Sequence, residues 1–131
     1  MKIAYDYQAF TNESYGGISR YYKDLIEELL KQGQEANIFA GIHRNFYISL
    51  LPDEVIHGVK LNGYPPKSRW AFRLFNHLIC QLQTQRWKPD IIHETYYSTL
   101  PVLKKNVARI TSVHDMITEL YPQKKSSQKN V

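Results

Sequence analysis

Two pairs of neighbouring histidine and acid residues are the part of this sequence best suited to chemistry. One pair is His93 and Glu94, and the other is His114 and Asp115. An imidazole beside a carboxylate suits general acid–base catalysis or a divalent metal site, of which the metal site is the weaker interpretation. The pairs stand at the ends of predicted strands, where adjacent side chains point to opposite faces, so each pair should contribute one group to a shared site. Alternatively, both histidines only satisfy buried backbone groups.

A glycine pair, Gly16 and Gly17, stands directly before a predicted helix. Glycine lets the backbone approach a ligand closely, and a helix N-terminus carries positive partial charge, so a phosphate can bind there. Arg20 follows in the first helical turn, where it reaches either a phosphate or only solvent. Neither the dinucleotide pattern G-x-G-x-x-G nor the P-loop lysine motif is present. A flexible turn without a ligand is therefore the alternative interpretation.

Tyrosines surround these positions along the chain, and their rings could stack on sugars or bases. They are Tyr5, Tyr7, Tyr15, Tyr21, Tyr22, Tyr96 and Tyr97. Tyrosine at the edge of a strand or helix more often simply packs, with its hydroxyl in water, so both interpretations stay open.

The composition is that of one compact domain. The chain has 131 residues, of which 43% are hydrophobic, and we assign the domain to residues 1–122. Residues 123–131 form a polar, basic tail that we expect to be disordered. The formal net charge of +5 favours anionic partners such as nucleotide phosphates, lipid headgroups or nucleic acid. Cys80 is the only cysteine, and its apolar helical surroundings predict a buried, inert thiol.

No stretch of the sequence approaches the roughly 20 apolar residues that span a bilayer. The N-terminus meets charged residues too soon for a signal peptide. On these grounds we expect a cytoplasmic protein.

The first third of the chain has the pattern strand, helix, strand. Residues 2–7 are the first predicted strand, and residues 8–17 are a loop rich in small and polar residues. A helix is predicted from Ile18, because apolar residues recur there at helical spacing, and Gly33 is its expected C-cap. Residues 36–40 follow as a second strand, which implies a right-handed crossover and a parallel pair.

Helices and strands continue to alternate through the rest of the chain. The predicted elements are a short helix near 46–51, a strand at 55–61, a long helix between the N-cap Ser68 and Lys88-Pro89, strands at 90–93 and 109–114, and a partly helical connection at 101–106. The expected apolar face of the long helix is Ala71, Leu74, Phe75, Leu78, Ile79 and Leu82. This alternation predicts a Rossmann-like α/β fold with an open, mostly parallel sheet and helices on both faces.

In such sheets, ligands bind beyond the carboxyl ends of the strands. The loop that ends at Gly17, the segment 93–98 and the residues 114–115 all follow predicted strands. We therefore expect them to meet at one edge of the sheet.

Four stretches resemble, in order and separation, landmarks of the N-terminal domain of a known family. They are Ile3-Ala4-Tyr5-Asp6, Tyr15-Gly16-Gly17-Ile18-Ser19-Arg20-Tyr21, Pro89-Asp90-Ile91-Ile92-His93 and Thr111-Ser112-Val113-His114-Asp115-Met116. The family is the group of retaining glycosyltransferases with two Rossmann-like domains, called family 4 or group 1. The resemblance covers nearly the whole chain up to Pro122 and implies that the chain is one half of the GT-B fold.

The resemblance also implies a role for each matching residue. Gly16 and Gly17 would lie against the donor diphosphate and the transferred sugar, and His114 beside the donor sugar and the acceptor as the catalytic residue. The family builds its acceptor site largely from this domain, and the candidate acceptor contacts here are Tyr15, Arg20, His93, Glu94 and Tyr96. A nucleotide-sugar would be the donor and a glycan or a lipid-linked group the acceptor, with no metal or other cofactor.

The family binds the nucleotide mainly with a C-terminal domain that carries two glutamates spaced E-x7-E, and this chain stops before that position. Glu27 and Glu35 match the spacing by chance, because they lie on and just beyond the first predicted helix. Positioning of donor and acceptor in a closed cleft can account for roughly 7 to 11 kcal/mol of a barrier. We therefore expect the chain alone to be inactive or nearly so.

Three other functions remain as alternatives. A stand-alone nucleotide- or anion-binding module without catalysis is the strongest of them. Nucleic-acid binding is disfavoured because no recognised motif or continuous basic helix is present, and a metal hydrolase built on the two histidine–acid pairs comes last. The basic charge also permits peripheral contact with the inner face of a membrane that carries the acceptor.

Overall fold

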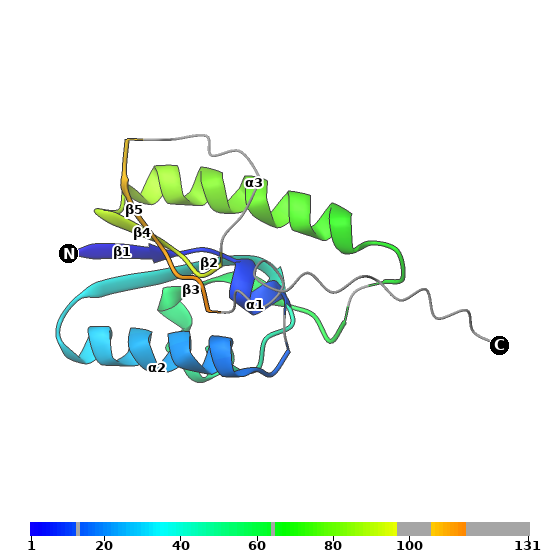
Figure 1. Cartoon of the computed structure of the whole chain (residues 1–131), viewed down its shortest axis with the longest axis horizontal. Helices are drawn as coiled ribbons and strands as arrows, with labels where there is room; N and C mark the ends of the chain where they lie inside the picture. Colours follow the sequence, from blue (N-terminus) through cyan, green and yellow to red (C-terminus); the bar gives the residue numbers. More distant parts are fainter. Residues whose placement is uncertain (13, 64, 97–105, 115–131) are drawn as a thin grey trace.

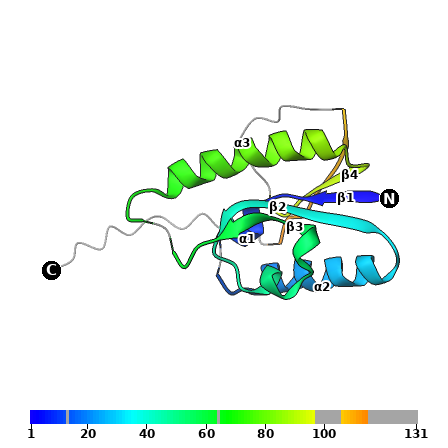
Figure 2. The same ribbon diagram turned by 180° about the vertical axis from the view of Figure 1, so that it is seen from behind.

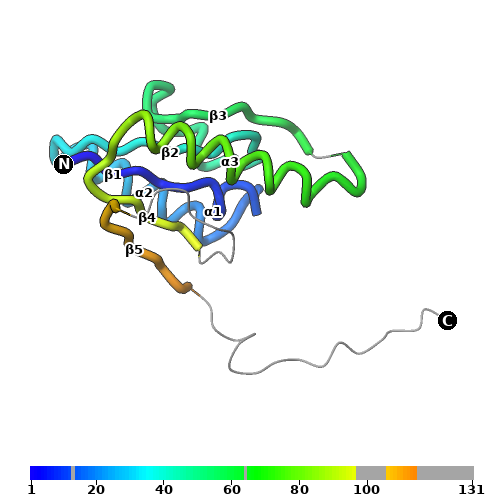
Figure 3. Tube along the Cα trace, turned by 90° about the horizontal axis from the view of Figure 1, so that it is seen from above, coloured from blue at the N-terminus to red at the C-terminus, as the bar shows by residue number. Residues whose placement is uncertain are grey.

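A five-stranded, all-parallel sheet lies between two long helices in the computed structural model (Figure 1). The structure describes residues 1–12, 14–63, 65–96 and 106–114. The strands are β1 (Lys2–Tyr5), β2 (Glu35–His43), β3 (Ile56–Lys60), β4 (Ile91–Glu94) and β5 (Ala108–Thr111), and their order in the sheet is β3-β2-β1-β4-β5 (Figure 3). Every neighbouring pair is parallel, which confirms the predicted Rossmann-like α/β class.

The two long helices cover opposite faces of the sheet, as both side views show (Figures 1 and 2). They are α2 (Gly17–Lys31) and α3 (Arg69–Trp87). The short helix α1 (Gln8–Asn12) follows β1, and two 3-10 turns, Tyr47–Leu50 and Asp53–Val55, connect β2 to β3. The prediction of helices on both faces is confirmed.

The alternation of side chains along the strands divides the core into two layers. On β1, Ile3 and Tyr5 belong to the layer under α2, while Ala4 packs with Phe39 and Cys80 under α3. Adjacent side chains of a strand point to opposite faces, so a strand buried on both sides needs apolar residues at successive positions. This is why the strands read as apolar runs.

The prediction that residues 8–17 form a loop is wrong in part, because the helix α1 forms within them. Ala9 and Phe10 are both buried in the layer under α2. Their burial stabilises one helical turn that has too few residues to show a helical period in the sequence.

Strand β2 is longer than the predicted 36–40, because its pairing with β3 continues past a bulge at Ala40. The register with β3 shifts between Phe39 and Gly41, and Gly41 has φ +62°. A Cβ on Gly58 of the neighbouring strand would lie 2.5 Å from the Gly41 carbonyl oxygen. Both glycines are therefore required by the bulge, and pairing continues beyond it to His43.

Both long helices end where the sequence predicted, but the predicted N-cap of α3 does not form. Gly33 follows α2 with φ +77°, and α3 ends at Lys88, which is left-handed with φ 53° directly before Pro89. Ser68 occupies the N-cap position of α3, but its hydroxyl donates to the carbonyl of Pro65 instead of capping the helix. The capping role predicted for Ser68 is therefore wrong.

The predicted apolar face of α3 is wrong for all its members except Ile79, which is partly buried, because the other side chains are exposed. Leu74, Phe75, Leu78 and Leu82 are each between 45% and 49% exposed. The face packed on the sheet instead buries Asn76, His77, Cys80 and Thr84. Two polar side chains of this inner face form hydrogen bonds. Asn76 accepts one from the Ile42 N–H at 2.8 Å and donates one to the Ile42 carbonyl at 2.9 Å. His77 Nδ1 lies 3.3 Å from the Tyr7 hydroxyl.

Some predictions fall outside the described residues. These are the connection at 101–106 except its last residue, the position of Asp115, and the domain boundary at 122 with the tail at 123–131. Within the described residues, no helix has both the length and the apolar character needed to cross a membrane.

Candidate functional site

The carboxyl edge of the sheet is organised around the buried carboxylate of Asp6, which follows β1. Its Oδ1 accepts hydrogen bonds from the backbone N–H and the hydroxyl of Thr95 at 2.9 and 2.6 Å, and its Oδ2 accepts one from Gln8 Nε2 at 2.6 Å. Burial raises the pKa of Asp6, and these hydrogen bonds oppose the rise. The Thr95 hydroxyl oxygen in turn accepts a hydrogen bond from the Ala9 N–H at 2.9 Å. Asp6 therefore ties the loop after β1 to the loop after β4.

His114 is fixed at this edge by Tyr22 of α2. Its Nε2 lies 2.7 Å from the Tyr22 hydroxyl, which also donates to the Thr95 carbonyl oxygen at 3.2 Å. The hydroxyl has one proton. When that proton goes to Thr95, His114 Nε2 carries its own hydrogen and donates to the Tyr22 oxygen, which leaves Nδ1 as an acceptor for a ligand. The Tyr21 ring, at 5.6 Å between centroids, contacts the same imidazole.

His93 lies beside His114 but is enclosed by the sheet and α2. Its ring centroid is 5.1 Å from that of Tyr5 and 5.3 Å from that of Tyr22, and its Nε2 lies 2.8 Å from the Ser112 hydroxyl oxygen. Burial, and next the positive charge that His114 can carry, lower the pKa of His93. His93 is therefore a neutral, hydrogen-bonded ring that packs against Tyr22, the residue that holds His114.

Glu94 lies on the opposite face of the sheet from His93. Its two carboxylate oxygens accept hydrogen bonds from Arg109 Nη1 and from the Thr111 hydroxyl, both at 2.7 Å. The expectation that a His–acid pair would split across the sheet is therefore confirmed for this pair. His114 and His93 share a site under α2, and Glu94 does not belong to it.

The glycine pair forms the N-terminus of α2. Gly16 is the N-cap residue, no side chain caps the helix there, and the first turn contains no acidic residue. A Cβ built on Gly17 meets no atom within 4 Å. The backbone of Gly16 is extended, with φ −172°, and neither glycine has a positive φ, so Gly17 contributes open space rather than a left-handed conformation. This geometry suits the predicted anion site.

The same helix joins the glycine pair to His114. Tyr22 comes five residues after Gly17, which at the helical rise corresponds to roughly 7.5 Å along the axis. The glycine pair and the residue that holds His114 are therefore less than two helical turns apart on α2.

The remaining predicted residues are more scattered. Tyr15 is 68% exposed and stacks on Phe46 at 5.1 Å between ring centroids, near the end of β2. Arg20 is exposed on α2. Tyr96 contributes its carbonyl oxygen, which accepts a hydrogen bond from Gln8 Nε2 at 2.7 Å. Tyr15 thus lies near the end of β2, and Tyr96 follows β4.

Sequence reasoning missed the residue that holds His114. Tyr22 comes four residues after Ile18, so it belongs to the apolar stripe of the predicted helix. Helical spacing cannot tell a tyrosine that only packs from one whose hydroxyl forms a buried hydrogen bond. The missed signal was the type of the residue, because a fully buried tyrosine needs a hydrogen-bond partner.

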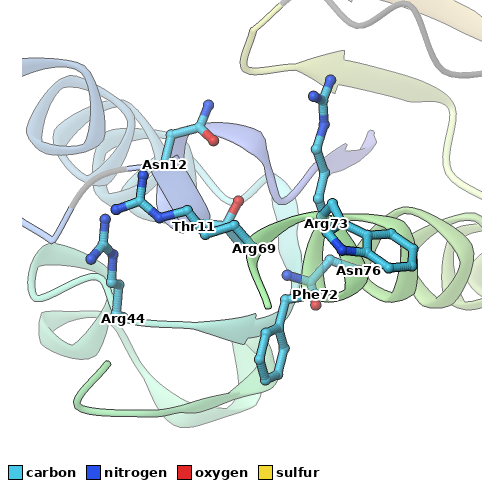
Figure 4. Close-up of a pocket in the computed structure, with 8 residues that line it drawn as sticks. Thr11, Asn12, Arg44, Arg69, Phe72, Arg73 and Asn76 are labelled. Carbon is cyan, nitrogen blue, oxygen red and sulfur yellow. The ribbon is translucent and has the colours of Figure 1, made fainter. Parts of the chain in front are cut away.

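A second hollow at the same edge was also missed. It is a pocket of about 360 Å³ between the end of α1, the residue after β2 and the first turns of α3 (Figure 4). Arg44, Arg69 and Arg73 line it. Arg44 escaped notice because the predicted second strand ended too early to place it at the edge of the sheet.

Metal binding finds no support in the geometry of the described part of the chain. Residues 1–12, 14–63, 65–96 and 106–114 contain no group of three histidine, cysteine, aspartate or glutamate side chains close enough to hold an ion. Cys80 is buried, and burial raises its pKa to about 12, which confirms that the thiol is buried.

Comparison with protein families gives a match over most of the chain. Residues 15–130 match the family model described as Glycosyltransferase Family 4. The match begins at the loop before the glycine pair and includes His93 and His114. No curated protein and no solved structure shows significant similarity to the chain.

Proposed function

The chain belongs to glycosyltransferase family 4, and we propose on this basis that it forms the acceptor-side half of a GT-B enzyme. That enzyme transfers a sugar, with retention of configuration, from a nucleotide-sugar to a glycan or lipid acceptor. A donor-binding domain supplies the second wall of the cleft, and the described chain alone has little or no activity. No metal or other cofactor takes part.

The observation that carries this proposal is the position of His114 beside α2. The Tyr22 hydroxyl fixes one ring nitrogen of His114 at 2.7 Å, while the uncapped N-terminus of the same helix is open to an anion. In the proposed complex the donor diphosphate binds at Gly16 and Gly17, and the free ring nitrogen of His114 faces the sugar. The His114 ring orients the sugar by hydrogen bonding, and this chain provides no covalent nucleophile.

The test joins the chain to a donor-binding domain from another family 4 enzyme and measures sugar transfer from a labelled nucleotide-sugar. His114→Ala should lower kcat by about 100-fold, because loss of a group that orients a reacting sugar can cost about that much. Val113→Ala is the matched control, because Val113 is the preceding residue and half-exposed. Full activity of the His114 variant would remove this residue from the mechanism.

The alternative is a stand-alone nucleotide- or anion-binding module, which the open N-terminus of α2 favours. Calorimetry on the chain alone distinguishes it from the transferase half. The transferase proposal predicts weak binding of a nucleotide-sugar. A Kd near 1 µM, equivalent to about −8 kcal/mol, would place most of the donor affinity in this chain and favour the module.

We also propose that the outer face of α3 contacts an anionic membrane. The stripe formed by Leu74, Phe75, Leu78 and Leu82 is half-exposed along the helix. The helix carries three arginines and no acidic residue, so an outward apolar stripe is combined with a helix of positive net charge. Apolar surface and positive charge together are what binds an anionic lipid surface.

Vesicle sedimentation tests the membrane proposal. The chain should pellet with vesicles containing phosphatidylglycerol and stay in solution with pure phosphatidylcholine, and Leu78→Ser should weaken the binding. If the chain instead forms a dimer that Leu78→Ser dissociates, and neither kind of vesicle binds it, the stripe is an interface between copies and the membrane proposal fails.

A further inference from the structure

The pocket between α1 and α3 concentrates positive charge at the carboxyl edge of the sheet. Arg44, just beyond β2, and Arg69 and Arg73, in the first two turns of α3, all line it. No acidic side chain is among its described lining residues. Cationic groups that share one hollow repel one another, and a bound anion offsets that repulsion.

Two of the three arginines are placed to hold one anion. In Figure 4, Arg44 and Arg69 extend to the same side of the pocket, close to Asn12. Arg73 extends away from these two arginines. Burial raises the pKa of the Tyr7 hydroxyl, and the charge of Arg73 opposes that rise. A planar guanidinium donates two parallel hydrogen bonds to a carboxylate or a phosphate, so Arg44 and Arg69 suit either group.

An exposed aromatic ring also lines this pocket. Trp70 is 72% exposed, and it lines both this pocket and an adjoining hollow of about 660 Å³ that Lys67 also lines. An exposed tryptophan offers a large apolar face with a polar edge, which suits the apolar face of a sugar ring. The pocket therefore combines an anion site with a surface for a pyranose.

The pocket adjoins the proposed donor site along the chain. Its lining includes Thr11 and Asn12 of α1, and the loop that follows them leads to Gly16. The backbone N–H of Phe46, two residues beyond Arg44, donates to the Ser14 carbonyl oxygen of that loop at 2.9 Å. The loop thus connects the two regions directly.

We infer that this pocket, the arginine pocket, is an acceptor subsite for an anionic sugar. The carboxylate of a uronic acid or the phosphate of a sugar phosphate binds between Arg44 and Arg69, and the sugar ring packs on Trp70. The inference rests on the proposed transferase function, because it names the chemical class of that enzyme's acceptor.

Titrations of the chain followed by two-dimensional NMR test the inference. The probes are methyl glucuronide, glucose 6-phosphate, inorganic phosphate and uncharged methyl glucoside, and the Trp70 indole signal reports the site. Both anionic sugars should bind at least about fivefold more tightly than methyl glucoside, since a charge-assisted hydrogen bond exceeds a neutral one. The tighter of the two identifies carboxylate or phosphate as the acceptor's charged group.

Three variants separate the pocket from general electrostatics. Arg69→Gln should weaken anionic sugars by about fivefold and leave methyl glucoside unchanged. Arg86→Gln, the same change near the other end of α3 and also at an exposed residue, is the control and should change nothing. Trp70→Ala should weaken every sugar but not inorganic phosphate. All three side chains are exposed, so the fold should tolerate the changes.

Two results would overturn the inference. One is equal weakening by Arg69→Gln and Arg86→Gln, which would mean that only net charge matters. The other is equal affinity for inorganic phosphate and for the anionic sugars, which would mean that the ring is not recognised. These measurements need no sugar transfer, so an inactive fused enzyme together with a selective pocket would refute the proposed function and leave an anionic-sugar site.

Discussion

Removing the Tyr22 hydroxyl tests the geometry on which the candidate site depends. Tyr22 and Thr95 are both fully buried, and the hydroxyl bonds to the Thr95 carbonyl and to His114 Nε2. Tyr22→Phe keeps the ring and its packing but deprives a buried carbonyl of its side-chain donor. A buried polar group left without a partner costs about 1–3 kcal/mol, so we expect the free energy of unfolding to fall by about 2 kcal/mol. For a domain of this size that lowers Tm by about 8 °C.

Urea unfolding of the chain measures the stability, and nitrogen NMR of the imidazole reports which ring nitrogen of His114 carries the proton. Tyr22→Phe should shift His114 away from the Nε2-protonated tautomer, because Nε2 no longer has an acceptor. Tyr21→Phe is the control: that ring also contacts His114, but Tyr21 is half-exposed and its hydroxyl makes no hydrogen bond to the described residues. A loss below about 0.5 kcal/mol in Tyr22→Phe, equal to that in the control, would refute the hydrogen-bonded cluster.

Three further predictions concern the framework of the site. Gly41→Ala should destabilise the chain by about 3 kcal/mol in urea unfolding, because alanine is strained at positive φ and its Cβ would lie 2.4 Å from Asn76 Oδ1. Burial, and to a lesser extent the charge of Lys60, lower the pKa of His43 to about 4. The unfolded state therefore binds more protons than the folded state between pH 4 and 6.5, and the free energy of unfolding should rise by about 2 kcal/mol as the pH rises across that range. His43→Gln should flatten this dependence of stability on pH, and an unchanged dependence would contradict the prediction. Cys80, with its pKa raised to about 12, should react with iodoacetamide at pH 8 only after unfolding, and rapid alkylation of the native chain would contradict its burial.

The fold class followed from the sequence because two periods alternate clearly along it. The apolar segment at residues 36–40, the short strand pattern at 90–93 and the helical stripe after Ile18 each lie within an observed element or overlap one closely. Local details depended on tertiary contacts instead. The helix α1 forms because Phe10 finds a place in the core, and β2 extends because Gly41 allows a bulge.

The sequence predicted where the candidate site lies but not the hydrogen bond between Tyr22 and His114 that holds it together. The rule that ligands gather at the carboxyl edge of a parallel sheet located His93, His114 and the glycine pair. The alternation of side chains correctly assigned His93 and Glu94 to opposite faces. No spacing rule links Tyr22 to His114, because they are 92 residues apart and meet only once the sheet is assembled.

The orientation of α3 shows why periodicity alone failed there. The helix has an apolar stripe wide enough to serve as its buried face, yet the sheet holds the opposite face through polar side chains. Asn76 bonds both backbone groups of Ile42, and a hydrogen-bonded amide is directional where apolar packing is not. This clamp fixes the rotation of the helix about its axis and aims Arg69 at the arginine pocket. It also leaves the leucine stripe outside the core of the chain, so two surfaces of one helix become available for binding. The polar inner face therefore underlies both proposed contacts, and because Asn76 also lines the arginine pocket, loosening the clamp would change the pocket directly.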